Sequence, residues 1–143
     1  MIQFTVAGPA VGKQRVRFVR QTGRAYTPER TLNYEARIAA AGQDAMNGRP
    51  LLEGPLRLDV DCYAVVPKSW SKKKRADALG HRVRPTGKPD ADNLLKSISD
   101  GLNLVIWVDD SQIVNAQVRK WYSDAPRVEI TVQQEPTGDD IFG

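Results

Sequence analysis

Residues 56–64 restrict the fold more than any other part of this chain. Leu56, Leu58, Val60 and Cys62 alternate there with charged or aromatic neighbours. A period of two is typical of a β-strand with one buried face and one open face. Such a strand requires a sheet around it and an apolar layer over its inner side. Further strands are predicted at residues 2–6, 104–108, 112–122 and 127–133, and a basic hairpin at residues 13–27.

Helical periodicity marks two longer segments. Thr27 and Pro28 form a helix start, with Thr as the cap and Pro in the first turn. The predicted helix runs to Met46 with a broad face of mostly small residues, Leu32, Ala36, Ala39 and Ala40, adjoined by Tyr34, Ile38 and Ala41. A second helix is predicted to start at Asp92, with an apolar face made of Leu94, Leu95, Ile98 and Leu102. A short basic helix is expected between residues 69 and 78, ending at Gly80.

These elements predict an α+β fold. A chain of 143 residues with 41% hydrophobic side chains has enough apolar surface for one core. We expect a single domain over residues 1–143, with a mixed β-sheet of about five strands packed against two main helices. Residues 134–143 are polar and are expected to form a flexible tail.

Two pairs of acids flank the second helix, Asp90 with Asp92 and Asp109 with Asp110. A helix of about ten residues rises roughly 15 Å, and an extended run over residues 104–108 covers roughly 16 Å. If the chain reverses at Asn103, the four carboxylates converge.

Converging acids in a basic chain require a cation between them, because like charges repel. Oxygen ligands without His or Cys favour Mg²⁺, or Mn²⁺ as its substitute, over zinc. The plainer alternative is structural. Asp90 and Asp92 would then only cap the helix, Asp109 and Asp110 would fill a turn, and Asp92 would pair with Lys96 as an ordinary i,i+4 ion pair.

The motifs around these acids resemble the RusA family of Holliday-junction resolvases, in its phage and prophage branch. They are K-P-D-x-D-N-L-x-K at residues 88–96, D-G-L-N at 100–103 and D-D-S-Q-I at 109–113. Two positions depart from the family pattern. Ala91 stands where a larger apolar residue is frequent, and Leu104 follows Asn103 where Gly is common.

The resemblance implies a Mg²⁺-dependent crossover junction endodeoxyribonuclease that acts as a homodimer on branched DNA, the four-way junctions of recombination and repair. Its ion would be held by Asp90, Asp92 and Asp110, with Asp109 as a weaker candidate. Lys96 lies one turn from Asp92 and would neutralise charge on the phosphate in the transition state. Two symmetric cuts suit a two-fold dimer with one site per subunit.

The net charge of +4 is unevenly distributed, with basic residues on both sides of the acidic centre. Such zones suit a polyanion held across a cutting site, whereas each zone alone also fits a solvated surface. The residues expected to bind DNA are Lys13, Arg15, Arg17, Lys72, Lys73, Lys74, Arg75 and Lys88. No Gly-rich phosphate loop, membrane-spanning run or signal peptide is apparent, so we expect a cytoplasmic protein without a nucleotide cofactor.

Three other residues have weaker functional readings. Asp61 is on the polar side of the strand at 56–64 and is a candidate to support the metal. His81 is expected to be solvated, and Cys62 is expected to be a small buried hydrophobe.

Two rival functions stay open. One is a non-cleaving DNA-binding accessory protein, and the other is a Mg²⁺-dependent nuclease or phosphoryl enzyme without junction specificity.

Overall fold

Four strands form the main sheet in the order β1-β6-β4-β5. They are β1 (Ile2–Ala7), β4 (Leu56–Val65), β5 (Ile113–Ser123) and β6 (Arg127–Gln134) in this computed structural model, which describes residues 1–136. The strand β6 is antiparallel to both β1 and β4, and β5 is parallel to β4. The sheet is therefore mixed, as predicted. A parallel pair needs a crossover connection, and here it carries the helices α2 (Lys72–Leu79) and α3 (Ala91–Leu102).

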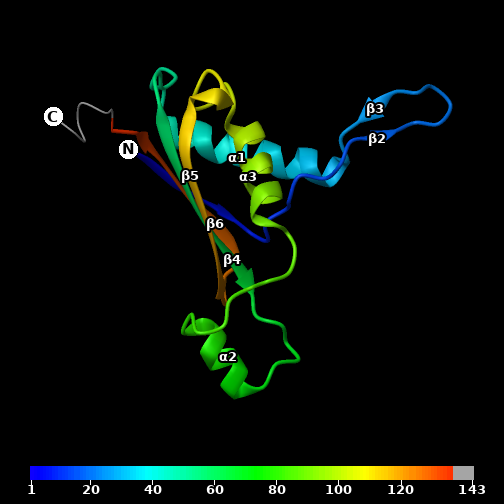
Figure 1. The fold of residues 1–143 in the computed structure, drawn as a ribbon, viewed down its shortest axis with the longest axis vertical. Coiled ribbons are helices and arrows are strands. Elements are labelled where there is room, and N and C mark those ends of the chain that lie inside the picture. The colour runs from blue at the N-terminus through cyan, green and yellow to red at the C-terminus, as the bar shows by residue number, and fades with distance from the viewer. Residues whose placement is uncertain (137–143) are drawn as a thin grey trace.

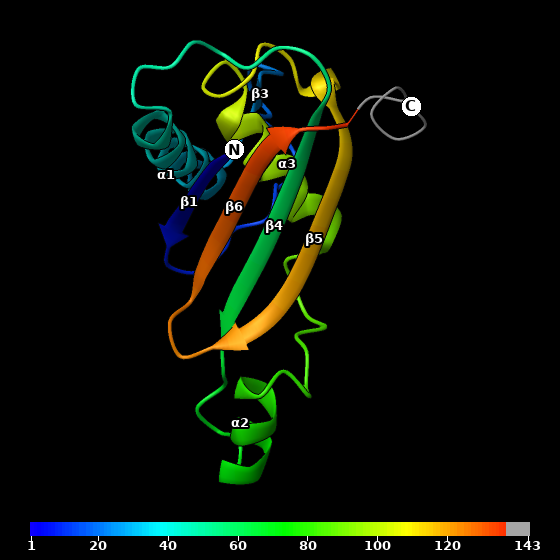
Figure 2. The same cartoon turned by 90° about the vertical axis from the view of Figure 1, so that its left-hand side faces the viewer.

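Both long helices lie on the same face of the sheet (Figures 1 and 2). These helices are α1 (Glu29–Met46) and α3. The other face has no helix over it among the described residues, and α2 lies beyond one end of the strands (Figure 2). Two short strands, β2 (Arg17–Phe18) and β3 (Ala25–Tyr26), form a separate ribbon. The α+β class is confirmed, with four strands in the sheet in place of about five.

The buried stripe of α1 differs from the predicted one. Leu32 is 50% exposed, and the buried residues are Thr31, Tyr34, Ile38, Gly42 and Met46. Tyr34 and Ile38, predicted only to adjoin the buried face, are its centre, and the prediction was wrong in centring the face on Leu32 and the alanines. The larger side chains of Tyr34, Ile38 and Met46 determine which side of the helix faces the core.

Two glycines bring α1 and α3 close together. A Cβ added to Gly101 would lie 3.0 Å from the Glu35 carbonyl oxygen and 3.1 Å from the Ile38 Cβ. A Cβ on Gly42 would lie 2.6 Å from a methyl carbon of Leu102. The axis of α3 is therefore fixed against α1 at this crossing.

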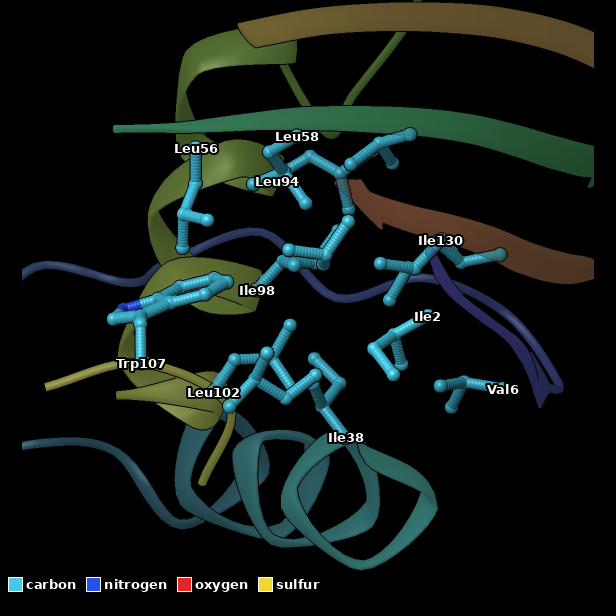
Figure 3. Close-up of a cluster of buried hydrophobic side chains, with 14 of the residues drawn as sticks. Ile2, Val6, Ile38, Leu56, Leu58, Leu94, Ile98, Leu102, Trp107 and Ile130 are labelled. Carbon is cyan, nitrogen blue, oxygen red and sulfur yellow. The ribbon is translucent and has the colours of Figure 1, made fainter. Parts of the chain in front are cut away.

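The core fills the space between the sheet and the two helices (Figure 3). Leu94, Ile98 and Leu102 of α3 have no exposed surface, and neither has Trp107 after it. They pack with side chains from β1 and from the two inner strands β4 and β6, including Ile2, Leu56, Leu58 and Ile130. The apolar face predicted for α3 is confirmed, with Leu95 only partly buried.

The predicted strand at residues 104–108 does not form. The chain makes a tight turn in which the Leu104 N–H donates to the Trp107 carbonyl at 2.8 Å, and Asn103 forms a bridge with Trp107. Ile106 and Trp107 are fully buried. These apolar residues cover the end of α3 and so do not extend back along it. A 3₁₀ turn, η1 (Asp110–Gln112), then leads into β5.

Residues 134 and 135 of the expected tail are held in the fold. Gln134 ends β6, and the Glu135 N–H donates to the Pro55 carbonyl at 3.0 Å. Residues 137–143 of the predicted tail lie outside the described part of the chain. Within residues 1–136, none of the helices has the length and apolar character needed to cross a membrane.

Candidate active site

Asp90 and Asp92 lie at the N-terminal end of α3, and both are exposed. The helix starts one residue earlier than predicted, with Asp90 as its N-cap. The Asp90 backbone carbonyl accepts the Leu94 N–H at 2.9 Å, but its carboxylate makes no capping hydrogen bond. No ion pair or hydrogen bond to either carboxylate occurs within residues 1–136. The fold therefore leaves both carboxylates available.

A loop from the N-terminal region supports this helix end. The Lys13 N–H donates to the Asn93 carbonyl at 2.9 Å, and the Ser97 hydroxyl lies 2.9 Å from the Val11 carbonyl. A Cβ on Gly12 would lie 2.8 Å from the Pro89 Cβ, so only glycine allows this close approach. These contacts fix the position of the acid pair relative to the start of the β2–β3 ribbon.

The space between this loop and α3 is a groove of about 740 Å³. Asp90 and Asn93 line it together with residues of the loop, and five basic side chains also line it, namely Lys13, Arg15, Arg17, Arg30 and Lys88. Four of these were predicted to bind DNA. Arg30 is the second residue of α1, and the sequence left open whether its side chain reaches solvent or DNA. A groove with such a lining suits a sugar-phosphate backbone.

The ammonium groups of Lys13 and Lys96 both form ion pairs with carboxylates. The Lys13 ammonium lies 2.7 Å from a Glu35 oxygen and 3.0 Å from Asp100. Burial lowers the pKa of Lys13, but hydrogen bonds to Glu35 and Asp100 outweigh it, so the pKa is raised overall. Lys96 Nζ donates to Asp100 at 3.1 Å, so the alternative pairing with Asp92 does not form. Lys96 is 60% exposed, so water and a phosphate compete readily for its ammonium.

Asp109 and Asp110 hydrogen bond within their own turn. Asp109 accepts the Ser111 N–H at 2.9 Å and forms a capping box with Gln112, whose side chain accepts the Asp109 N–H at 3.0 Å. The Ser111 backbone hydrogen bond lowers the pKa of the Asp109 carboxyl. Asp110 accepts the indole N–H of buried Trp107 at 2.7 Å. Both acids therefore stabilise the turn that covers the end of α3.

The two acid pairs lie at opposite ends of α3 (Figure 1). A helix of 12 residues is roughly 18 Å long. Because residues 104–108 do not extend back along α3, Asp109 and Asp110 stay near its C-terminal end. Across residues 1–136, no three His, Cys, Asp or Glu side chains come together in a way that could hold a metal ion. The predicted convergence of all four acids within one chain is therefore wrong.

The helix α2, which carries the second group of basic residues, lies beyond the end of the strands and away from the β2–β3 ribbon (Figure 1). Lys72, Lys73 and Lys74 are exposed, and Lys74 Nζ lies 4.0 Å from the centre of the Trp70 ring. Arg75 pairs with Asp124 in the β5–β6 connection. These side chains form a second basic surface at the far end of the strands, and DNA binding by them stays a prediction.

Asp61 is on the uncovered face of the sheet, away from the α3 acids. Its carboxylate accepts from Arg119 Nε at 2.7 Å and from the Trp121 indole N–H at 2.9 Å. The Arg119 hydrogen bond lowers the pKa of Asp61. The His81 ring is in edge contact with Trp121, with ring centres 4.8 Å apart. A role for Asp61 beside the metal was wrong, because alternation along β4 turns its side chain away from the helices.

Together these features define a class of protein: an α+β fold with two unpaired acids at the start of one helix, the first of which lines a basic groove. Residues 7–133 match the family Endodeoxyribonuclease RusA. The chain therefore belongs to the RusA family, and membership implies a nuclease. It is also similar to a Bacillus subtilis (strain 168) protein described as "Uncharacterized protein YqaN", with 38% identity over 139 residues, covering 93% of this chain and 96% of that protein. The family resemblance drawn from the motifs is confirmed.

Proposed function

We propose that this protein is a Mg²⁺-dependent, structure-specific endodeoxyribonuclease that resolves Holliday junctions by paired symmetric nicks in recombination and repair, in the cytoplasm of a bacterium or a phage-infected cell. One observation carries the proposal: the carboxylates of Asp90 and Asp92 form no hydrogen bond with the described residues, and Asp90 lines a basic groove. Acids without a hydrogen-bond or ion-pair partner in the fold, next to a polyanion-binding surface, favour a catalytic role.

The pair suits Mg²⁺, which proteins often bind through one or two carboxylates together with water and substrate phosphates. When bound, the ion polarises the scissile phosphate and lowers the pKa of a bound water. Asp90 and Asp92 hold the ion in this proposal, and Mn²⁺ substitutes for it. Arg15 and Lys88 bind the flanking phosphates. Lys96 moves from Asp100 to the phosphate and offsets its growing charge.

Asp110 joins this site only from a second copy of the chain. Within one chain it lies at the far end of α3 and accepts from Trp107. The surface around it carries exposed apolar side chains of a kind that proteins bury against a partner, namely Leu104, Val108 and Val114. We therefore propose a homodimer in which Asp110 of the partner subunit completes the Asp90 and Asp92 pair.

The first test compares a synthetic four-way junction with a linear duplex, each incubated with Mg²⁺, with Mn²⁺ or with EDTA. The unaltered protein is expected to make paired nicks in the junction alone and only with a metal. Asp90→Asn should bind the junction in EDTA with the same affinity as the unaltered protein. With Mg²⁺ or Mn²⁺ it should not cut the junction. Equal cutting of the duplex would leave a general nuclease, and junction binding without any cutting would leave the accessory protein.

The second test mixes two inactive variants. A dimer of one Asp90→Asn, Asp92→Asn subunit and one Asp110→Asn subunit has one intact site if the partner supplies Asp110, and none if each chain uses its own. We expect mixing to restore single nicks but not paired ones, and to restore Mn²⁺ binding measured by titration calorimetry. If mixing restores neither, Asp110 does not act across the dimer.

A further inference from the structure

The ribbon formed by β2 and β3 projects from the body of the protein beside α1 (Figure 1). Arg17 pairs with Tyr26 and Phe18 with Ala25. The ribbon packs chiefly against itself, and its connection closes with a Val19 N–H to Arg24 carbonyl hydrogen bond of 2.8 Å. An isolated two-stranded ribbon is only marginally stable in water, so this one is suited to act against a partner.

Large apolar side chains on the ribbon are exposed to solvent. Phe18 is 70% exposed, Val16 48% and Tyr26 45%. Directly opposed residues share a face in an antiparallel pair, so Phe18 and Ala25 form an apolar face, and Arg17 and Tyr26 lie on the other. The ring of an exposed phenylalanine is removed from water only when a partner covers it, and this burial stabilises the complex.

Charge identifies the partner. Residues 13–28 include Lys13, Arg15, Arg17, Arg20 and Arg24 and no acid. A second copy packed ribbon to ribbon would oppose these arginines to one another, which disfavours a protein partner of the same sequence. A nucleic acid offers phosphates for the arginines and base faces for the aromatic ring.

The base of the ribbon is held firmly next to the acid pair. The hydroxyl of buried Thr31 donates to the Gln14 side chain at 3.0 Å and lies 3.3 Å from the Gln14 N–H. Lys13 ties the same segment to both helices through Glu35 and Asp100. The groove beside Asp90 continues along Arg15 and Arg17 toward the ribbon. DNA with a phosphate at the acids would therefore pass along the ribbon.

We propose that Phe18 inserts into the base stack at the branch point of the DNA, and that this contact makes the protein prefer branched over linear DNA. The inference rests on the proposed function and names the feature of the substrate that is recognised. In a continuous duplex every base is stacked on both sides, and insertion requires unstacking. At a branch point the stacking is already interrupted, so an aromatic ring inserts at lower cost.

The test uses a four-way junction with 2-aminopurine next to the branch point, whose fluorescence rises when the base is unstacked. All ribbon changes are made in the Asp90→Asn protein in EDTA, so that the DNA stays intact. We expect the parent to raise the fluorescence at the junction. Phe18→Ala should remove more than half of the rise and weaken junction binding roughly tenfold, with duplex binding unchanged within about twofold. Phe18→Trp should restore both signals.

Two controls separate the alternatives. Leu32→Ala removes an apolar side chain of similar exposure from α1, outside the ribbon, and should change neither signal. Arg24→Ala should weaken binding to junction and duplex alike and reduce its salt dependence. The proposal is overturned if Phe18→Ala keeps the fluorescence rise and the junction preference, or if it turns a dimer into a monomer in sedimentation. Junction cutting by the unaltered protein is scored separately, so loss of that activity would refute the proposed function and leave the Phe18 test intact.

Discussion

The two ends of α3 each carry a pair of aspartates, and the fold treats the pairs differently. At the N-terminal end, the carboxylates of Asp90 and Asp92 accept no hydrogen bond from other described residues. At the C-terminal end, Asp109 caps a 3₁₀ turn and Asp110 accepts from the indole of Trp107. The residue type is the same at both ends. What separates a catalytic candidate from a structural acid here is whether the carboxylate already has a partner.

Asp90→Asn gives the largest expected effect and tests the N-terminal half of this comparison. Junction cutting should fall on the order of a thousandfold, because the change removes an anionic ligand at the reacting phosphate. The free energy of unfolding should stay within about 0.5 kcal/mol, since the carboxylate makes no contact in the fold. Rates of junction cutting with Mg²⁺ test the first expectation, and urea denaturation tests the second. A loss of stability as large as that of a core variant would show that Asp90 has an unrecognised structural role.

Asp110→Ala tests the C-terminal half. Removing the acceptor leaves the Trp107 indole N–H buried without a partner, which should lower the free energy of unfolding by about 1–3 kcal/mol. Asp110→Asn keeps an oxygen at that position and should retain most of the stability. Urea denaturation of both variants provides the measurement. If the Asn variant folds normally but cannot cut DNA, Asp110 has a structural and a catalytic role; equal stability of all three proteins would remove the structural one.

Leu104→Gly tests the turn that keeps Asp109 and Asp110 at their end of α3. Leu104 has a φ of +63° and its side chain is 65% exposed, so it is strained by its backbone and gains little from packing. Glycine, common at this position in the family, should raise the free energy of unfolding by up to about 1 kcal/mol. Thermal or urea unfolding measures the gain, with Val108→Gly as a control that should destabilise. A loss of stability in Leu104→Gly would contradict the assigned backbone strain.

Asp61 gives the smallest expected effect and supplies a third kind of aspartate, one held in a surface ion pair. Its pKa is lowered in the folded state by Arg119, so its contribution is complete above the unfolded pKa of about 3.9 and is lost as the pH falls through the lower folded pKa. The contribution should be a few tenths to about 1 kcal/mol. Unfolding of Asp61→Asn and the unaltered protein should differ by that amount near pH 6 and converge as the pH drops below about 4. A difference that does not depend on pH would exclude the ion pair as its cause.

Local patterns predicted most elements correctly because neighbouring residues decide them. Alternation at residues 56–64 and 127–133 identified β4 and β6, and the spacing of Leu94, Ile98 and Leu102 identified the buried face of α3. Ser71 caps α2 by accepting the Lys74 N–H at 3.2 Å, whereas the sequence before the basic run had left Ser69 and Ser71 as equal candidates for the cap. The candidate acids Asp90 and Asp92 were also evident from the motif.

The misassigned segments involve competition between local preference and burial. Residues 104–108 are apolar and suit a strand. Burying Ile106 and Trp107 at the end of α3 nevertheless lowers the free energy of the fold more than an extended run would. The face of α1 was misjudged for a related reason, since Tyr34 and Ile38 bury more area than the alanines beside them. Neither outcome follows from periodicity alone, because it depends on which surfaces meet.

The sequence by itself determined the family, the class of fold, the catalytic candidates at the start of α3 and the basic character of the chain around them, since these depend on residue types at short spacings. Only the tertiary structure decided which acids have partners. A hydrogen bond such as that from Trp107 to Asp110 depends on the path of the chain between them. Because one turn replaced a strand, the two acid pairs are separated by the length of a helix.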